Sequence, residues 1–177
     1  MAIQHELELT FPTHTVTRPV LCEMGRSSGV VFNIISANVS QHRGRFHLLL
    51  IGEEAQIQAA EAFLREAGVT VEVLSSKPYR AALPVAPERQ PSRPDEPRAR
   101  KKLWITFIGE VRREPLTWEM AARYDVTFDI RQSSTGESVG IMAILLEGPE
   151  SHVEGAIAFL RGHGAEVEPI EKTVLEG

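Results

Sequence analysis

The sequence contains the same unit twice. When it is shifted by 96 positions, residues 7–73 align with residues 103–169 without a gap. Matching positions occur throughout this register, among them Leu7 with Leu103, Phe11 with Phe107, Pro19 with Pro115, Met24 with Met120, Phe63 with Phe159 and Gly68 with Gly164. Apolar, proline and glycine positions that recur together indicate one supersecondary unit used twice. We therefore expect two similar domains joined in one chain.

The segment between the repeats has a different composition. Six prolines lie between residues 75 and 100, among arginines and other polar residues. Proline lacks an amide donor and favours extended backbone, so neither a helix nor a central strand is expected there. We predict a first domain at 3–75, a linker at 76–100 and a second domain at 101–173. The linker is basic, and solvation is a simpler interpretation than contact with RNA, lipid or the domains.

Composition and charge limit the classes of function. The chain has 177 residues, 42% of them hydrophobic, and a formal net charge of −5. This balance is typical of globular proteins and argues against a dedicated nucleic-acid binder. No apolar run approaches the roughly 18 residues of a membrane-spanning helix, and the first residues do not resemble a signal peptide. We expect a cytoplasmic protein without membrane insertion. Cys22 is the only cysteine, so no disulfide can form within the chain. Its internal position in a helix-like stretch predicts a small core residue.

Hydrophobic periodicity predicts the same six elements in each unit. Alternating apolar residues indicate strands and apolar residues at helical spacing indicate helices. In the first unit the strands are expected at 5–11, 30–35, 46–51 and 69–74, with helices capped by Thr17 and ended by Gly68. In the second unit the strands are expected at 102–107, 126–130, 141–146 and 165–170, with helices opened by Pro115 and by a Ser151–Glu154 capping box.

This order is β-α-β-β-α-β, so the fold class is α+β with two ferredoxin-like domains. Each domain is expected to have an antiparallel four-stranded sheet with two helices on one face. The last strand then lies at an edge, which is where Pro169 is tolerated. Small units with an open face or edge are usually closed by another copy. We therefore predict pairing of the two domains within the chain, or a homodimer.

Motifs for catalysis and metal binding are missing from the sequence. There is no GxxxxGK[ST] phosphate loop, no HExxH and no paired Cys/His spacing, and the six histidines are scattered. RNA-recognition modules of this fold need aromatic residues on the central strands, whereas 46–51 and 141–146 are mainly aliphatic. Arg112 and Arg113 lack the glycine-rich loop of acylphosphatase-type sites. We expect no enzyme activity, no cofactor, no metal and no nucleic-acid partner.

Polar residues at the end of the second strand are the remaining candidate site. The first unit has Asn33-Ile34-Ile35 there, after a helix that begins near Pro19 and before the Ala62-Phe63-Leu64-Arg65 helix and Val71-Glu72-Val73. This arrangement resembles the NIL domain, the regulatory C-terminal domain of bacterial methionine-importer ATPases. The resemblance covers both units. It implies an ACT-like amino-acid sensor in which methionine binds between paired copies and slows transport.

The resemblance implies a ligand site formed by the Asn33 side chain and by the backbone around Asn38 and Val39. The matching positions of the second unit are Asp129 and Thr135. An amide both donates and accepts hydrogen bonds, as a zwitterionic ligand requires, whereas an ionised carboxylate only accepts them. The second site is therefore expected to be altered or lost. In both units, a short polar residue near a bend also commonly bonds to its own backbone.

Two functions follow from the sequence. The first is a non-catalytic sensor that binds a small amino acid, with methionine or another sulfur compound as the candidate, at the interface of two paired domains. The alternative is a protein-interaction or structural module that has kept the fold without a ligand. In either case the chain has no ATPase domain, and an unidentified protein partner would read the signal.

Overall fold

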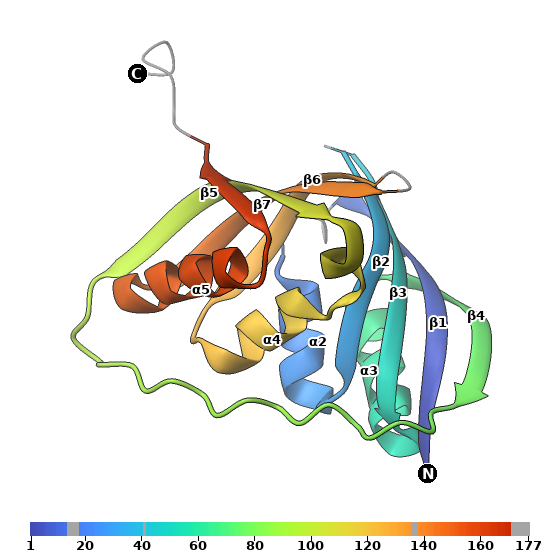
Figure 1. Ribbon diagram of the computed structural model, residues 1–177. Helices are drawn as coiled ribbons and strands as arrows, with labels where there is room; N and C mark the ends of the chain where they lie inside the picture. The colour runs from blue at the N-terminus through green and yellow to red at the C-terminus, as the bar shows by residue number, and fades with distance from the viewer. Residues whose placement is uncertain (14–17, 41, 136–137, 171–177) are drawn as a thin grey trace.

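The computed structural model describes residues 1–13, 18–40, 42–135 and 138–170 (Figure 1). Its strands form one eight-stranded sheet in the order β4-β1-β3-β2-β6-β7-β5-β8. The strands are β1 (Ala2–Phe11), β2 (Val31–Val39), β3 (Gly44–Glu53), β4 (Thr70–Pro78), β5 (Arg98–Ile108), β6 (Thr127–Thr135), β7 (Val139–Pro149) and β8 (Glu166–Pro169). The helices are α2 (Val20–Ser28), α3 (Glu54–Glu66), α4 (Leu116–Arg123), α5 (Glu150–Gly162) and the 3-10 helix η1 (Gly109–Arg113).

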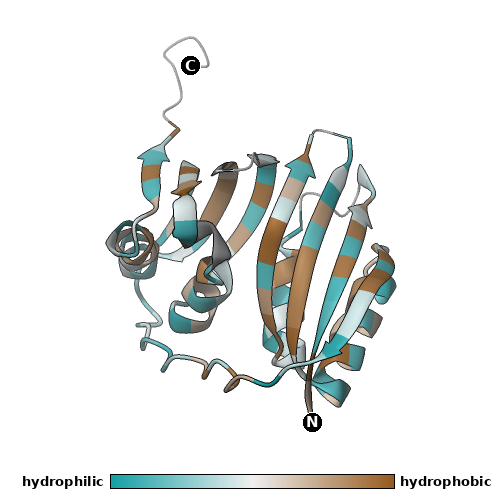
Figure 2. Cartoon of the chain, turned by 45° about the vertical axis from the view of Figure 1, so that its right-hand side comes forward, coloured by the Kyte–Doolittle hydropathy of each residue, from teal (hydrophilic) through white to brown (hydrophobic). Residues whose placement is uncertain are grey.

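Each half has the predicted β-α-β-β-α-β order, and the prediction of two ferredoxin-like domains of the α+β class is confirmed. All strand pairs are antiparallel. The last strand of each half lies at an outer edge of the sheet, and Pro169 pairs with Leu103 on such an edge strand. In the first half the helices cover one face and leave the other open, as Figure 2 shows with α3 behind the strands.

Alternating residues of the strands build the core. Leu7 and Leu9 of β1 are fully buried, and so are Leu103 and Ile105 at the equivalent positions of β5. The helices add buried residues from the same face of each half; they are Met24, Ile57 and Leu64 in the first half and Met120, Val153 and Leu160 in the second. These side chains belong to one continuous apolar cluster that extends through both halves. The two domains therefore share a core.

The halves join along the second strand of each. Val39 of β2 pairs with Ser133 of β6, and α2 packs against α4 beside this junction. Cys22 is buried here, as predicted, and its Sγ accepts a hydrogen bond from the Phe128 amide of the other half at 3.3 Å. Arg26 of α2 donates to the Ala121 carbonyl at 3.2 Å and to the Val126 carbonyl. Thiol and guanidinium contacts therefore connect the halves in addition to apolar packing.

The second strand of each half contains a β-bulge. The pairing of β2 with β3 shifts register at Ile35, and the pairing of β6 with β7 shifts at Arg131, the equivalent position. An inserted residue bends the strand and changes which face the following side chains occupy. Both strands continue beyond the bulge, to Val39 and Thr135. The residues predicted to follow a strand end therefore lie within the strand itself.

The segment between the repeats is packed against the second half. Strand β4 extends to Pro78 and β5 begins at Arg98, so both strands reach into the predicted linker. Pro78 is tolerated because β4 is an edge strand. The amide of Gln90 donates to the Arg123 carbonyl at 2.8 Å. Most residues of 76–97 are nevertheless exposed, so the segment is solvated along much of its length and attached to the second half at points such as Gln90.

The helix ends follow the predictions only in part. Gly68 and Gly164 have positive φ angles of 91° and 94° after α3 and α5, which is the conformation expected of them. Thr17 lies outside the described residues. The Ser151–Glu154 capping box is wrong, because α5 begins at Glu150 and the Ser151 amide donates instead to the Glu96 carboxylate at 2.7 Å.

Replacing Arg26 with alanine is expected to loosen the junction of the halves. The substitution leaves the Val126 carbonyl without its guanidinium donor, and the Ala121 carbonyl keeps only Arg89 at 3.5 Å, which should cost about 1–3 kcal/mol of unfolding free energy. Arg65→Ala is the control, because Arg65 is exposed and lies 3.9 Å from Glu61 on its own helix, so a loss below about 0.5 kcal/mol is expected. Chemical denaturation of both variants measures the difference, and equal losses would contradict this role of Arg26.

Candidate ligand-binding sites between the two halves

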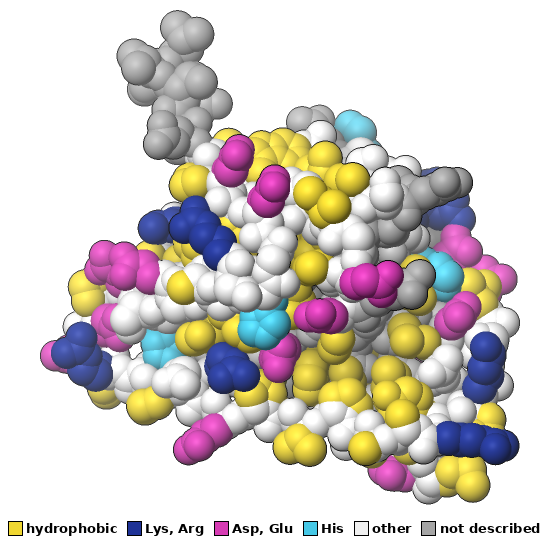
Figure 3. Space-filling view, viewed as in Figure 1, with side chains coloured by type: hydrophobic (Ala, Val, Ile, Leu, Met, Phe, Trp, Pro, Cys, Tyr) yellow, Lys and Arg dark blue, Asp and Glu magenta, His cyan; other side chains and the backbone are white. Residues whose placement is uncertain are grey.

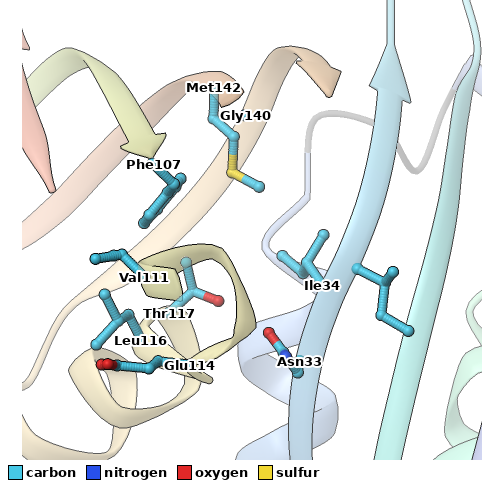
Figure 4. A pocket seen from close by; sticks show the side chains of 10 residues that line it. Asn33, Ile34, Phe107, Val111, Glu114, Leu116, Thr117, Gly140 and Met142 are labelled. Atoms are coloured by element: carbon cyan, nitrogen blue, oxygen red, sulfur yellow. The ribbon is translucent and has the colours of Figure 1, made fainter. Parts of the chain in front are cut away.

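A small pocket lies where β2 of the first half meets the second half. We call it the Asn33 pocket; its cavity volume is about 30 Å³. It is lined by Asn33, Ile34 and Ile35 from β2 and by Phe107, Val111, Glu114, Leu116, Thr117, Gly140 and Met142 from the second half. Figure 4 shows Ile34 on the β2 side of this space and Phe107, Met142 and Thr117 on the other. Its polar lining residues from the two halves are thus Asn33, Glu114 and Thr117, and in Figure 4 the Glu114 carboxylate points away from Asn33.

Local structure explains how these residues come together. Asn33 pairs with Leu49 in the regular part of β2, two residues before the bulge. Glu114 precedes Pro115, the N-cap of α4, and Leu116 begins that helix. The helix packs against β2, so its first turn faces the strand. The first helix of one half therefore covers the second strand of the other.

A second pocket repeats this arrangement with the halves exchanged. We call it the Asp129 pocket; its cavity volume is about 20 Å³. It is lined by Phe11, Arg18, Val20, Leu21, Val39, Phe46, Phe128, Asp129 and Ile130. Seven of these positions match residues of the Asn33 pocket after the shift of 96. The matching pairs are Asp129 and Asn33, Ile130 and Ile34, Phe11 and Phe107, Arg18 and Glu114, Val20 and Leu116, Leu21 and Thr117, and Phe46 and Met142. The two pockets are one site that occurs twice.

The polar groups of the two pockets differ in charge. The Asn33 pocket combines a neutral amide with the Glu114 carboxylate, whereas the Asp129 pocket combines a carboxylate with the Arg18 guanidinium. Arg18 also forms an ion pair with Glu23 at 3.1 Å. The two sites are therefore chemically unequal.

Asp129 is a buried carboxyl group with a perturbed titration. Its residue is only 7% exposed, and desolvation by burial raises its pKa to about 6, although the neighbouring Arg131 guanidinium acts in the opposite direction. Its Oδ2 lies 3.2 Å from the Arg131 Nε. Asp129 also borders a cavity of about 150 Å³ that includes Arg100 and Glu147. The Arg131 guanidinium, at the bulge of the same strand, is thus the main group that stabilises the ionised form of Asp129.

The structure does not bring the predicted site residues into one place. Asn33 lines the first pocket, whereas Val39 lines the Asp129 pocket, because the antiparallel junction places the end of β2 beside β6. Asn38 lines a separate hollow of about 440 Å³ with Arg45 and His47. Thr135 ends β6, and its side chain lies outside the described part of the chain.

Glu114 and Arg18 are the site residues that sequence reasoning missed. Each directly precedes the proline before the first helix of its half, and the repeat alignment places them opposite each other. A search of the alignment for positions where charge reverses would have identified them.

The described residues contain neither a cluster of metal-ligating side chains nor a membrane-spanning helix. Among residues 1–13, 18–40, 42–135 and 138–170, no group of three or more His, Cys, Asp or Glu is arranged to hold a metal ion. None of the helices in this part of the chain has both the length and the apolar character needed to cross a membrane.

Comparison with known proteins identifies relatives of part of the chain. The methionine import ATP-binding protein MetN of Burkholderia thailandensis is 37% identical over 75 residues, which are 40% of this chain and 22% of that protein. MetN of Ralstonia nicotianae is 36% identical over 75 residues, or 40% of this chain and 21% of that protein. The chain therefore matches about a fifth of the length of these relatives.

Solved structures resemble the whole chain only distantly. The regulatory subunit of aspartate kinase from Thermus thermophilus, in its ligand-free form, is 15% identical with a TM-score of 0.29, covering 93% of this chain and 97% of that one. A structure described as a putative glycine cleavage system transcriptional repressor is 10% identical with a TM-score of 0.32, covering 97% and 99%. These scores are too low to carry an argument.

The family itself is established by the sequence pattern. The profile of the NIL domain matches residues 6–73 and again residues 102–169, which together are well over half of the chain. Both matches fall on complete β-α-β-β-α-β units, and each includes the second strand that lines a pocket. The chain belongs to the NIL domain family and contains two copies of that domain.

Proposed function

We propose that this protein is a non-catalytic regulatory sensor that binds a small amino acid, methionine first among the candidates, between its two NIL domains. The observation that supports this most is the pair of equivalent pockets, each lined by residues from both halves. A ligand held by both halves binds some arrangements of the halves better than others and shifts the population toward them.

The chemistry of the Asn33 pocket suits an amino acid with an apolar side chain. The Asn33 amide has both a donor and an acceptor, and so has the Thr117 hydroxyl, as the charged ends of an amino acid require. Phe107, Leu116 and Met142 provide an apolar wall. A thioether makes favourable contacts with aromatic rings, and Phe107 offers such a ring. Methionine is further suggested by the name of the MetN relatives, which match 40% of the chain.

The size of the pockets explains how binding becomes a signal. Cavities of about 30 Å³ and 20 Å³ are far smaller than the roughly 300–1,000 Å³ of ordinary ligand sites. An amino acid therefore enters only if the halves move apart. Within the described residues, β2 and β6 are paired only at Val39 and Ser133, where the two halves of the sheet join. Opening at this narrow junction is the movement that a protein partner would detect.

Titration with the twenty amino acids tests the proposal. We expect methionine to bind, and at 100 times its dissociation constant it should add about 2.7 kcal/mol to the unfolding free energy. Asn33→Ala should weaken binding at least about tenfold, because it removes the amide hydrogen bonds. Asn38→Ala is the matched control, since Asn38 lies in a different hollow, and it should leave affinity unchanged. Binding by none of the amino acids would favour a structural module instead.

The altered second site gives a prediction about pH. Because the pKa of Asp129 is raised to about 6 in the folded chain, against an ordinary value near 3.9, the folded state prefers the protonated form. The free energy of unfolding therefore falls as pH rises from about 4 to about 6. Above about pH 6 this group lowers it by on the order of 2–3 kcal/mol. Asp129→Asn should be more stable than the original chain at pH 7.5, and the difference should shrink toward pH 4.

Denaturation at several pH values measures this difference. Asp95→Asn is the control, because Asp95 is exposed in the segment between the domains, and its stability should follow that of the original chain at every pH. A gain from Asp129→Asn that is the same at pH 4 and pH 7.5 would show that the buried charge is not its cause.

A further inference from the structure

The open faces of the two half-sheets differ sharply in chemistry. On the first half this face carries two ion pairs, Glu8 with Arg45, and Glu6 with His47 at 3.3 Å. These residues share a face because Glu8 pairs with His47 and Thr10 with Arg45 in the β1–β3 register. The equivalent positions of the second half, 96 residues later, are Lys102, Trp104, Ile141 and Ala143. Three of the four charged or ionisable positions have therefore become apolar.

The apolar residues form a patch that is exposed to solvent. Trp104 is 37% exposed, Ile141 40% and Ile108 49%. They lie on adjacent strands and on one face, because Trp104 pairs with Ala143 and Thr106 with Ile141. We call these three residues the Trp104 patch. Figure 3 shows apolar side chains gathered along the top of the molecule in this view, over β5. Exposed apolar patches with a polar rim mark interaction surfaces.

From this contrast we propose that the Trp104 patch is an interface with a second copy of this chain, formed by the open face of the second half. The charges around the patch are arranged for such self-association. Lys102 lies two residues before Trp104 on β5, and Glu166 of β8 pairs with Thr106, two residues after it. Glu168 pairs with Trp104 itself. Basic and acidic groups thus lie at opposite ends of the patch.

A two-fold axis that crosses the strands at Trp104 matches these groups. This axis runs perpendicular to the strands and reverses their direction. Each residue of β5 therefore faces the residue on β5 of the second copy that is equally far from Trp104 in the opposite direction. Lys102 then faces Thr106 and its neighbour Glu166, and Ile141 faces Leu145, which pairs with Lys102. Trp104 thus meets its own copy and Lys102 meets Glu166 at the rim, as in specific interfaces. Ile141 lies over the largely buried Leu145, and Ile108 lies over Arg100.

The first half supplies the reason why only one face associates. Its equivalent positions form ion pairs whose partners lie on the same chain, and desolvating them in an interface would be unfavourable. The patch spans only a few strands, at the small end of specific interfaces, so the dimer should be weak and depend on concentration. Its dissociation constant is expected to be on the order of 10 μM.

Sedimentation of the full chain from about 1 μM to about 200 μM tests this proposal. We expect a monomer–dimer equilibrium. The double variant Trp104→Glu/Ile141→Arg places the residues of the first half's open face on the second half, so the fold has a precedent for them. It should weaken association at least about tenfold. Leu74→Ser is the control: Leu74 is 45% exposed on β4, outside the patch, and its variant should dimerise normally.

A charge exchange tests the orientation of the two copies. Lys102→Glu and Glu166→Lys should each weaken the dimer, because Lys102 of each copy faces Glu166 of the other. The double variant should restore the dimer, because it exchanges the two charges. Far-ultraviolet circular dichroism confirms that each variant is folded. A chain that stays monomeric up to about 200 μM, or a dimer unaffected by Trp104→Glu/Ile141→Arg, would overturn the proposal.

Discussion

The structure depends on the packing of the α2–β2 side of one half against the α4–β6 side of the other. At the centre of this contact the rings of Phe32 and Phe128 lie 6.5 Å apart, and both residues are buried. Cys22 accepts its hydrogen bond from Phe128 beside them. Because these residues come from equivalent positions of two similar units, the contact has an approximate two-fold axis. Both pockets lie on the flanks of this contact and arise from the same symmetry.

Hydrophobic periodicity was sufficient to predict the architecture of each half. Alternation at Leu7, Leu9 and Phe11 and the helical spacing of Ile57, Ala60 and Leu64 correspond to the buried residues of β1 and α3. These are local patterns, and a unit that repeats them twice has few alternative topologies. The last strand was placed correctly at an edge because the β-α-β-β-α-β order puts it there, and Pro169 agrees with that position. The element boundaries differ by a few residues, as at β4, which extends to Pro78.

Contacts across the sequence could not be predicted in this way. Helix α5 begins without a cap from its own side chains, because Glu96, 55 residues earlier, accepts a hydrogen bond from the Ser151 amide. His152 likewise donates through Nε2 to the Pro91 carbonyl at 3.0 Å and accepts the Asp125 amide through Nδ1 at 2.8 Å. No local pattern encodes such partners. They attach the largely exposed segment between the domains to the second half at a few points.

In the candidate site, too, local sequence predicts some features, while others depend on contacts between the two halves. Asn33 was identified from its place in the repeat, and it does line a pocket, but Val39 lines the other one. The sequence shows which residues share a strand, whereas the junction of the halves decides which residues share a pocket. Glu114 and Arg18 illustrate this, since each lies 81 or more residues from the polar strand residue whose pocket it lines. The repeat alignment shows that their charges are opposite, and the packing of the two halves shows which pocket each of them lines.

Fusion of two units into one chain explains why the two sites differ. In a symmetric dimer of a single unit, any substitution would change both pockets and both open faces at once. In the fused chain, Asp129 can replace the asparagine in one pocket while Asn33 stays in the other. Arg131 at the bulge then offsets the buried charge of Asp129 at 3.2 Å without affecting Ile35, its counterpart in the first half. The same freedom allows ion pairs on one open face and the Trp104 patch on the other. The repeat therefore preserves the packing that both halves need and lets their surfaces acquire separate functions.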